Sequence, residues 1–73
     1  MNVFEKLVDL LAEYMEIDPQ TITMDTTFKS LNLDSLDIAE MVLNVEDELN
    51  ITLELDESMT TVKDIVGAIE AAL

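Results

Sequence analysis

Apolar residues recur at helical spacing in three separate segments, and this periodicity constrains the fold more than any other feature of the chain. The first segment predicts a helix from about residue 2 to residue 15. The second predicts a helix that begins at Asp34 or Ser35 and ends near Leu49, and the third a helix that begins after Thr61. The three apolar stripes consist of Phe4, Leu7, Val8, Leu11 and Met15, then Ile38, Met41, Val42, Val45 and Leu49, then Val62, Ile65, Val66, Ile69 and Leu73. We therefore expect an all-α fold.

The length of 73 residues limits this fold to one small domain that spans residues 1–73. Aromatic residues are scarce, because only Phe4, Tyr14 and Phe28 occur, so the core must be built from Leu, Ile, Val and Met. We expect a free energy of unfolding of roughly 5 kcal/mol or less for so small a core. A body of this size has no room for a deep active-site cleft.

Polar residues support the predicted helix ends. Asp34 or Ser35 can cap the free amide groups at the start of the second helix. Thr61 and Asp64 match a capping pattern in which each side chain bonds the backbone of the other residue. Asn50 suits the left-handed conformation that commonly follows the last turn of a helix.

Two connections join the predicted helices. Asp18-Pro19 ends the first helix, and residues 16–34 form a long Thr-rich loop that must be anchored in so small a domain. Apolar and polar residues alternate over residues 51–55, where we expect an extended segment because a lone strand has no partner. A short turn of helix around Asp56 to Met59 should follow it. The predicted anchors of the long loop are Ile17, Ile22, Phe28 and Leu31.

The charge balance is strongly acidic, with 17 Asp and Glu against three Lys, which gives a formal net charge of −14. Nucleic acid is excluded as a natural partner, and stable association with an anionic membrane is not expected, because both need clustered cations. A field this negative attracts basic partner proteins and destabilises the folded state through self-repulsion. Salt or divalent cations should therefore stabilise the protein.

The chain has neither Cys nor His, which excludes disulfides, thiolate nucleophiles, imidazole bases and the usual zinc ligands. A hydrolase with Ser35 as nucleophile would lack a base, since Lys29 lies in the long loop. The calcium-binding loop pattern of the EF-hand is also absent, so only weak cation binding to acidic clusters is expected. We expect neither catalytic residues nor a specific metal site.

No apolar run is long enough to span a membrane, and the acidic N-terminal stretch resembles neither a signal peptide nor an Arg-rich transit peptide. A cytoplasmic, monomeric chain is the simplest expectation. An organelle protein whose transit peptide had been removed would look the same.

The second helix carries two apolar strips rather than one. On a helical wheel the additional strip begins at Ser35 and lies opposite the core stripe. Single exposed leucines are common and need no function. The functional interpretation is a docking surface, in which leucines supply contact area and acids meet Lys or Arg of a partner. This outer strip consists of Leu36, Ala39, Glu40, Leu43 and Asp47, with Asp37, Glu46 and Glu48 at its margins.

The residues Asp34-Ser35-Leu36-Asp37, followed by Glu40, Val42 and the acidic run Glu46-Asp47-Glu48, resemble the acyl carrier protein family. The resemblance covers nearly the whole chain, because it includes the first helix, Phe28 and Leu31 in the loop, and Thr60-Thr61-Val62. It implies a small four-helix bundle with a short third helix and a long loop between helices 1 and 2.

The resemblance also implies a function. A holo-synthase, which is a phosphopantetheinyl transferase, would transfer 4′-phosphopantetheine from coenzyme A to Ser35, with Asp34 and Leu36 completing the motif. The thiol of this arm would carry acyl groups as thioesters to basic-surfaced enzymes of fatty acid synthesis. The N-terminus of a helix favours the phosphodiester, because free amides and the positive end of the helix dipole face it.

Two sets of residues follow from the same resemblance. The partner-binding surface would consist of Leu36, Asp37, Ala39, Glu40, Leu43, Glu46 and Asp47. An apolar interior that shelters the acyl chain would be lined by Ile38, Met41, Val42, Val45, Met59, Val62 and Ile65. Methionine suits such an adaptable lining, although these residues can equally be core alone.

Departures from the family pattern leave alternatives open. Asn32 stands where the family usually has Gly, and Asn tolerates the left-handed conformation of that turn. The connection over residues 51–59 is shorter than in typical fatty-acid carriers, which leaves the third helix and the pathway open. Polyketide or nonribosomal peptide synthesis is the alternative pathway. The alternative from another class is an unmodified acidic interaction module, with Ser35 as a plain helix cap; capping by Asp34 would instead leave the Ser35 hydroxyl free.

Overall fold

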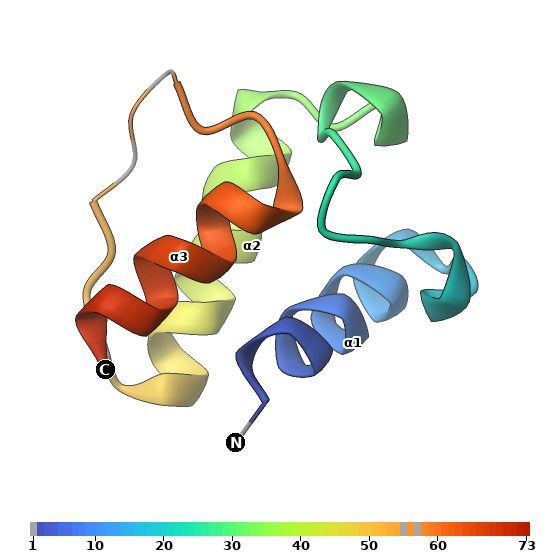
Figure 1. Cartoon of the computed structure of the whole chain (residues 1–73). Coiled ribbons are helices and arrows are strands. Elements are labelled where there is room, and N and C mark those ends of the chain that lie inside the picture. Colours follow the sequence, from blue (N-terminus) through green and yellow to red (C-terminus); the bar gives the residue numbers. More distant parts are fainter. Residues whose placement is uncertain (1, 55, 57) are drawn as a thin grey trace.

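The computed structural model describes residues 2–54, 56 and 58–73, and this part of the chain is helical. It contains three α-helices, namely α1 (Val3–Met15), α2 (Ser35–Leu49) and α3 (Val62–Ala72), and the short 3-10 helices η1 (Pro19–Thr21) and η2 (Lys29–Leu31). Figure 1 shows α3 in front of α2, with α1 packed beside both. The all-α fold is confirmed, and the three α-helices occupy the predicted ranges.

The described residues contain three α-helices, so they do not confirm the predicted four-helix bundle. In the connection between α2 and α3, the Met59 N–H donates to the Asp56 carbonyl (3.2 Å) and the Ser58 N–H donates to the Asp56 carboxylate (2.8 Å). These bonds lie where the sequence predicted a short turn of helix, around Asp56 to Met59. Parts of this prediction lie outside the described residues, namely Leu55 of the extended segment and Glu57 of the turn.

Side-chain caps begin the first and last α-helices. The Asn2 side chain accepts the Glu5 N–H at the start of α1 (3.1 Å). At the start of α3, Thr61 Oγ1 accepts the Asp64 N–H (3.3 Å) and the Asp64 carboxylate accepts the Thr61 N–H (3.1 Å), so the predicted capping box is confirmed. The backbone N–H groups of Thr60 and Thr61 hold the pKa of Asp64 below its usual value.

Three non-glycine residues of the described part adopt the left-handed conformation. Asn32 (φ 59°) and Asn50 (φ 56°) do so as the sequence predicted. Glu16 (φ 57°) ends α1 in the same way, which the sequence did not predict. Asparagine tolerates this region better than glutamate does, so the position of Asn32 allows the turn before α2 to form without glycine.

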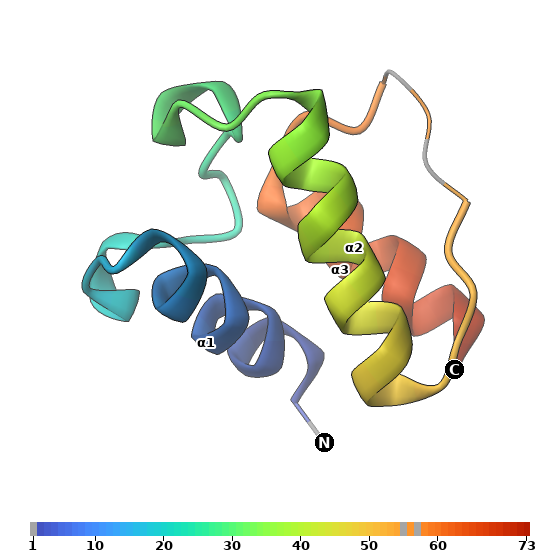
Figure 2. The same ribbon diagram turned by 180° about the vertical axis from the view of Figure 1, so that it is seen from behind.

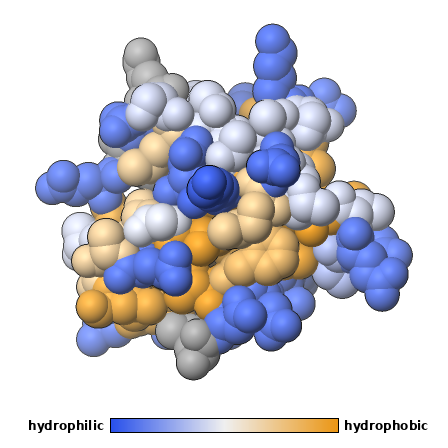
Figure 3. All heavy atoms as spheres, in the orientation of Figure 1, coloured by the Kyte–Doolittle hydropathy of each residue, from blue (hydrophilic) through white to orange (hydrophobic). Residues whose placement is uncertain are grey.

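The core is aliphatic and receives residues from all three α-helices and from the long loop. Leu7, Leu11 and Ile65 are among its fully buried side chains. Leu73 was predicted to extend the stripe of α3 but is exposed, because the helix ends at Ala72. On the face shown in Figure 3, apolar residues gather over α3 and toward α1, with hydrophilic residues around them. The buried set is Val3, Leu7, Val8, Leu11, Ala12, Ile22, Phe28, Met41, Val42, Val45, Val62, Ile65, Val66 and Ile69.

The long loop is fixed to the start of α3. Its predicted anchors Ile22 and Phe28 are buried, while Ile17 and Leu31 are half-buried. Residues Thr27 and Thr61 form an isolated antiparallel bridge, around which the Phe28 N–H donates to the Thr60 carbonyl (3.0 Å). The loop therefore enters α2 from a fixed position.

Candidate functional site

The first turn of α2 is capped by Asp34. Asp34 Oδ1 accepts the Asp37 N–H (2.9 Å), and Asp37 Oδ2 accepts the Asp34 N–H (3.2 Å), which completes a reciprocal capping box. The Ile38 N–H also donates to the Asp34 carbonyl (3.0 Å). The sequence left the cap between Asp34 and Ser35 open, and the structure assigns it to Asp34. Ser35 is thus the first residue of the helix.

Ser35 differs from the other two serines of the chain. The Ser30 hydroxyl donates to the Thr27 carbonyl (2.7 Å), and the Ser58 hydroxyl donates to the Asp56 carboxylate. Ser35 is exposed, and its hydroxyl makes no hydrogen bond to another described residue. Of the three serines, Ser35 therefore presents its hydroxyl to an incoming group at the lowest cost in lost bonds.

The outer strip of α2 lies on one open face of the molecule. Viewed from behind, α2 lies in front of α3, with no other element across it (Figure 2). Leu36 is 75% exposed and Leu43 is 60% exposed, and Ala39, Glu40 and Asp47 are exposed beside them. Two large apolar side chains among acids on one uncovered helix form a surface suited to a small, charged interface.

Two acids at the margin of the outer strip have structural contacts. Asp37 is half-buried and belongs to the capping box of α2. Glu46 is also half-buried, and its Oε2 accepts the Leu53 N–H at 2.8 Å, which attaches the connection after α2 to the helix. No sequence pattern predicts this hydrogen bond, because it depends on the path of the connection.

Tyr14 of α1 is a residue of this surface that the sequence did not single out. Its hydroxyl oxygen lies 2.9 Å from Asp37 Oδ1 and 2.9 Å from Glu40 Oε2. Hydrogen bonding to Glu40, then to Asp37, raises the pKa of the phenol above its usual value, because both carboxylates stabilise the protonated form. No sequence pattern relates Tyr14 to α2, since the contact arises only when the two helices pack.

A cavity of about 330 Å³ lies beside the start of α2. Of the seven residues predicted to line an acyl-chain pocket, Ile38 and Met59 line this cavity, and both are half-buried. The other five, Met41, Val42, Val45, Val62 and Ile65, are buried in the core. The sequence missed Phe28 and Leu33, which also line the cavity; an apolar residue directly before a helix cap is the signal that could have indicated Leu33.

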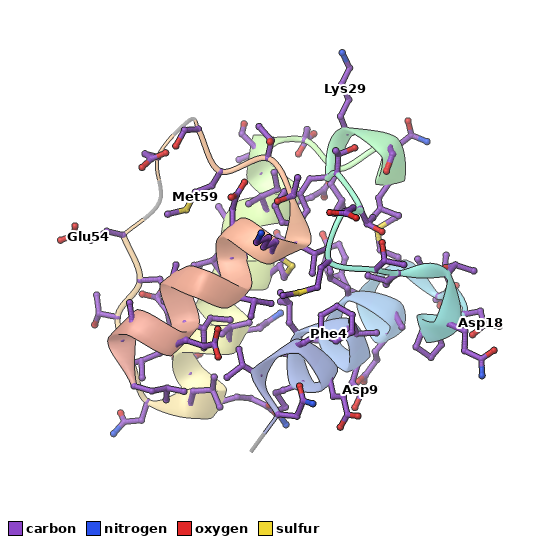
Figure 4. All side chains as sticks on the ribbon, viewed as in Figure 1. Phe4, Asp9, Asp18, Lys29, Glu54 and Met59 are labelled. Carbon is purple, nitrogen blue, oxygen red and sulfur yellow. The ribbon has the colours of Figure 1, made fainter. Side chains whose placement is uncertain are left out.

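Lys29 of η2 is the cationic residue among those that line this cavity. In Figure 4 the side chain of Lys29 extends away from the body of the molecule.

Among residues 2–54, 56 and 58–73, no three acidic side chains are placed to hold a metal ion. No α-helix in this part of the chain has the length and apolarity needed to cross a membrane.

The fold and the site together define a small helical domain that presents the exposed Ser35 hydroxyl at the start of an acidic helix. Residues 5–69 match the family described as "Phosphopantetheine attachment site". The chain is 37% identical over 70 residues to the acyl carrier protein of Streptococcus thermophilus, with 96% of this chain and 95% of that protein covered. It is 33% identical to the acyl carrier protein of Lactococcus lactis subsp. cremoris, with 96% of each covered.

The chain therefore belongs to the acyl carrier protein family, as its resemblance to that family predicted. The cofactor of the family is 4′-phosphopantetheine, which supplies the thiol that the chain itself lacks. The chain is a carrier and not an enzyme.

Proposed function

We propose that the Ser35 hydroxyl carries 4′-phosphopantetheine and that the chain delivers acyl groups, as thioesters on this arm, to the enzymes of fatty acid synthesis. The observation that supports the attachment point most directly is the exposed Ser35 hydroxyl at the first position of α2, without a hydrogen bond to a described residue. Asp34 provides the cap in its place, so modification of Ser35 leaves the helix start intact.

The residues around Ser35 fit a phosphodiester at this point. The first N–H groups of an α-helix point out of its N-terminal end, where they and the helix dipole stabilise an anion. A group that takes the proton of the Ser35 hydroxyl would have to come from the holo-synthase, since no base of the described part bonds to this hydroxyl. The chain thus supplies the nucleophile and its position, and the partner supplies the base.

The outer strip of α2 is our proposed docking surface for the holo-synthase and for basic-surfaced acyl-processing enzymes. The exposure of Leu36 and Leu43 between Glu40 and Asp47 supports this assignment. Because it begins next to Ser35, a bound enzyme would meet the attachment point directly. The proposed contact residues are Leu36, Asp37, Ala39, Glu40, Leu43, Glu46 and Asp47.

The cavity beside the start of α2 is our proposed entrance for an attached acyl chain, since Ile38 and Leu33 bring apolar surface close to Ser35. The buried residues Met41, Val42, Val45, Val62 and Ile65 would line a deeper pocket if the core loosens around the chain. We also infer that the fold is a four-helix bundle, whose short third helix includes the hydrogen bonds from Ser58 and Met59 to Asp56. The whole chain, residues 1–73, would then form one acyl carrier domain, which acts as a cytoplasmic monomer.

Intact-mass analysis after incubation with coenzyme A and a broad-specificity phosphopantetheinyl transferase tests the attachment point. The wild-type chain should gain the mass of one phosphopantetheine, and Ser35→Ala should gain none. Ser30→Ala and Ser58→Ala are matched controls that should be loaded like the wild type, because the hydroxyls of these serines bond within their own turns. A wild-type chain that gains no mass would instead support an unmodified interaction module.

A further inference from the structure

Tyr14 connects two α-helices at the edge of the proposed docking surface. It lies near the C-terminal end of α1, and its hydroxyl reaches two acids of α2, Asp37 and Glu40. The tyrosine side chain is 40% exposed, so its burial in the core does not explain its position. The contact with the two carboxylates is the feature that needs an explanation.

We propose that Tyr14 is a positioning residue of the docking surface, which holds the carboxylates of Asp37 and Glu40 side by side so that one Lys or Arg of a partner enzyme can contact both. This inference rests on the proposed function, because it assumes that a basic enzyme docks on α2. The partner group is a cation, since both positioned groups are acids on a chain with a net charge of −14.

The two carboxylates can accept more hydrogen bonds than the Tyr14 hydroxyl donates. A phenol has a single proton, yet its oxygen lies 2.9 Å from an oxygen of each carboxylate. The two carboxylates therefore share one donor, and like charges held this close repel each other. An ammonium or guanidinium group that approaches from solvent supplies the missing donors and the opposite charge.

The same contacts connect the acid pair, Asp37 and Glu40, to the proposed attachment point at Ser35. Asp37 accepts the Tyr14 hydroxyl through Oδ1 and the Asp34 N–H through Oδ2 (3.2 Å). Asp34 directly precedes Ser35 and caps the helix that begins there. A partner cation on the acid pair thus binds at a fixed position relative to the Ser35 hydroxyl. Fixing these side chains before binding lowers the ordering cost that association would otherwise carry.

Tyr14→Phe tests the proposal, because it removes the hydroxyl and keeps the ring. With the phosphopantetheinyl transferase and coenzyme A, we expect KM for the carrier to rise about threefold to tenfold, the range for one lost hydrogen bond. The value of kcat should change less than about twofold, since the enzyme supplies the reacting base. An unchanged or lower KM would overturn the proposal.

A double-mutant cycle separates positioning from a general effect on the fold. The Tyr14→Phe effect should persist in Asp47→Asn, because this exposed acid of the outer strip accepts no hydrogen bond from the Tyr14 hydroxyl. It should disappear when Asp37→Asn and Glu40→Gln are combined, because the hydroxyl then has no carboxylates to position. A Tyr14→Phe effect of equal size in both backgrounds would contradict the inference.

The titration of Tyr14 provides a readout that is independent of loading. Tyr14 is the only tyrosine and the chain has no tryptophan, so tyrosinate absorbance reports this residue alone. The wild-type phenol should ionise at higher pH than in the Asp37→Asn, Glu40→Gln variant. A wild-type chain that takes no phosphopantetheine would refute the proposed function, whereas a loaded wild type with an unaffected Tyr14→Phe would refute this inference only.

Discussion

At the scale of single residues, the start of α2 divides two tasks between neighbours. Asp34 bonds the free N–H of Asp37, and Ser35 leaves its hydroxyl exposed. The preceding turn makes this division possible: Asn32 adopts the left-handed conformation, and the Leu33 N–H donates to the Phe28 carbonyl (3.0 Å). A reactive side chain and a stable helix start are thereby supplied by different residues.

Glu40→Lys should weaken docking and leave the fold intact. Glu40 is exposed on the outer strip, so a lysine there places like charges opposite a basic partner. We expect KM for the phosphopantetheinyl transferase to rise about tenfold or more. The substitution turns an attraction between charges at the rim of the interface into a repulsion, and it also weakens the electrostatic steering of the partner. The thermal midpoint should shift by less than about 3 °C, as is usual for surface substitutions.

Glu70→Lys is the charge-matched control for this prediction. Glu70 is exposed on α3, so the substitution changes the net charge equally but not on the outer strip. Its KM should stay close to that of the wild type. Equal increases in KM for both variants would show that overall charge, and not the outer strip, governs docking.

At the scale of helices, α3 combines a complete capping box with one weak position. Thr61 and Asp64 satisfy the first turn, but Gly67 lies in the helix interior, where glycine costs conformational entropy. Gly67 is exposed, and apart from its chain neighbours and the backbone of its own helix, a Cβ atom at this position would have no atom within 4 Å. The weakness is therefore not required by packing.

Gly67→Ala should stabilise the protein by about 0.5 to 1 kcal/mol, because alanine restricts the unfolded chain and fits the helix without strain. Urea unfolding followed by circular dichroism measures this change, and the slope of the transition should stay constant. A less stable Gly67→Ala variant would mean that the glycine has a role which its open surroundings do not reveal.

Helical periodicity and capping residues predicted most of this architecture, and the reasons are local. Leu7, Leu11 and Met41 lie on the predicted stripes because burial selects one face of a helix. Contacts such as Tyr14 with Glu40, or Glu46 with the Leu53 N–H, could not be predicted in this way. They depend on how one element packs against another, and a helical wheel contains no information about its neighbour.

The candidate site shows the same division between local and tertiary information. Ser35 and the exposed leucines of the outer strip follow from their positions in a single helix. The lining of the cavity does not, because Phe28 and Leu33 reach it from the long loop. A helical wheel indicates which residues face the interior, but not which of them border a cavity. Five of the predicted pocket residues therefore lie in the core, while Ile38 and Met59 line the cavity.

At the scale of the whole molecule, charge repulsion opposes the fold. The net charge of −14 is confined to a body with extents of 26 × 26 × 19 Å. In the described part of the chain, one ion pair joins two elements, between Lys6 of α1 and Glu48 of α2 (2.6 Å). Both side chains are partly exposed, so this pair contributes little.

Salt should therefore stabilise the protein strongly. The Debye length falls from about 30 Å at 0.01 M salt to about 8 Å at 0.15 M, so charges across the whole body repel only at the lower concentration. We expect the thermal midpoint to rise by about 5 °C or more between these concentrations. The increase should be smaller in Glu70→Lys, and a midpoint that does not depend on salt would contradict this view.

Locating the phosphopantetheine within the chain tests the central claim most directly. After loading from coenzyme A, the wild-type protein is digested and the modified peptide is fragmented by tandem mass spectrometry. We predict that the arm is found on Ser35 alone, because the hydroxyls of the other two serines, Ser30 and Ser58, are hydrogen-bonded within the described part of the chain. An arm on Ser30 or Ser58, or a loaded Ser35→Ala variant, would contradict the account.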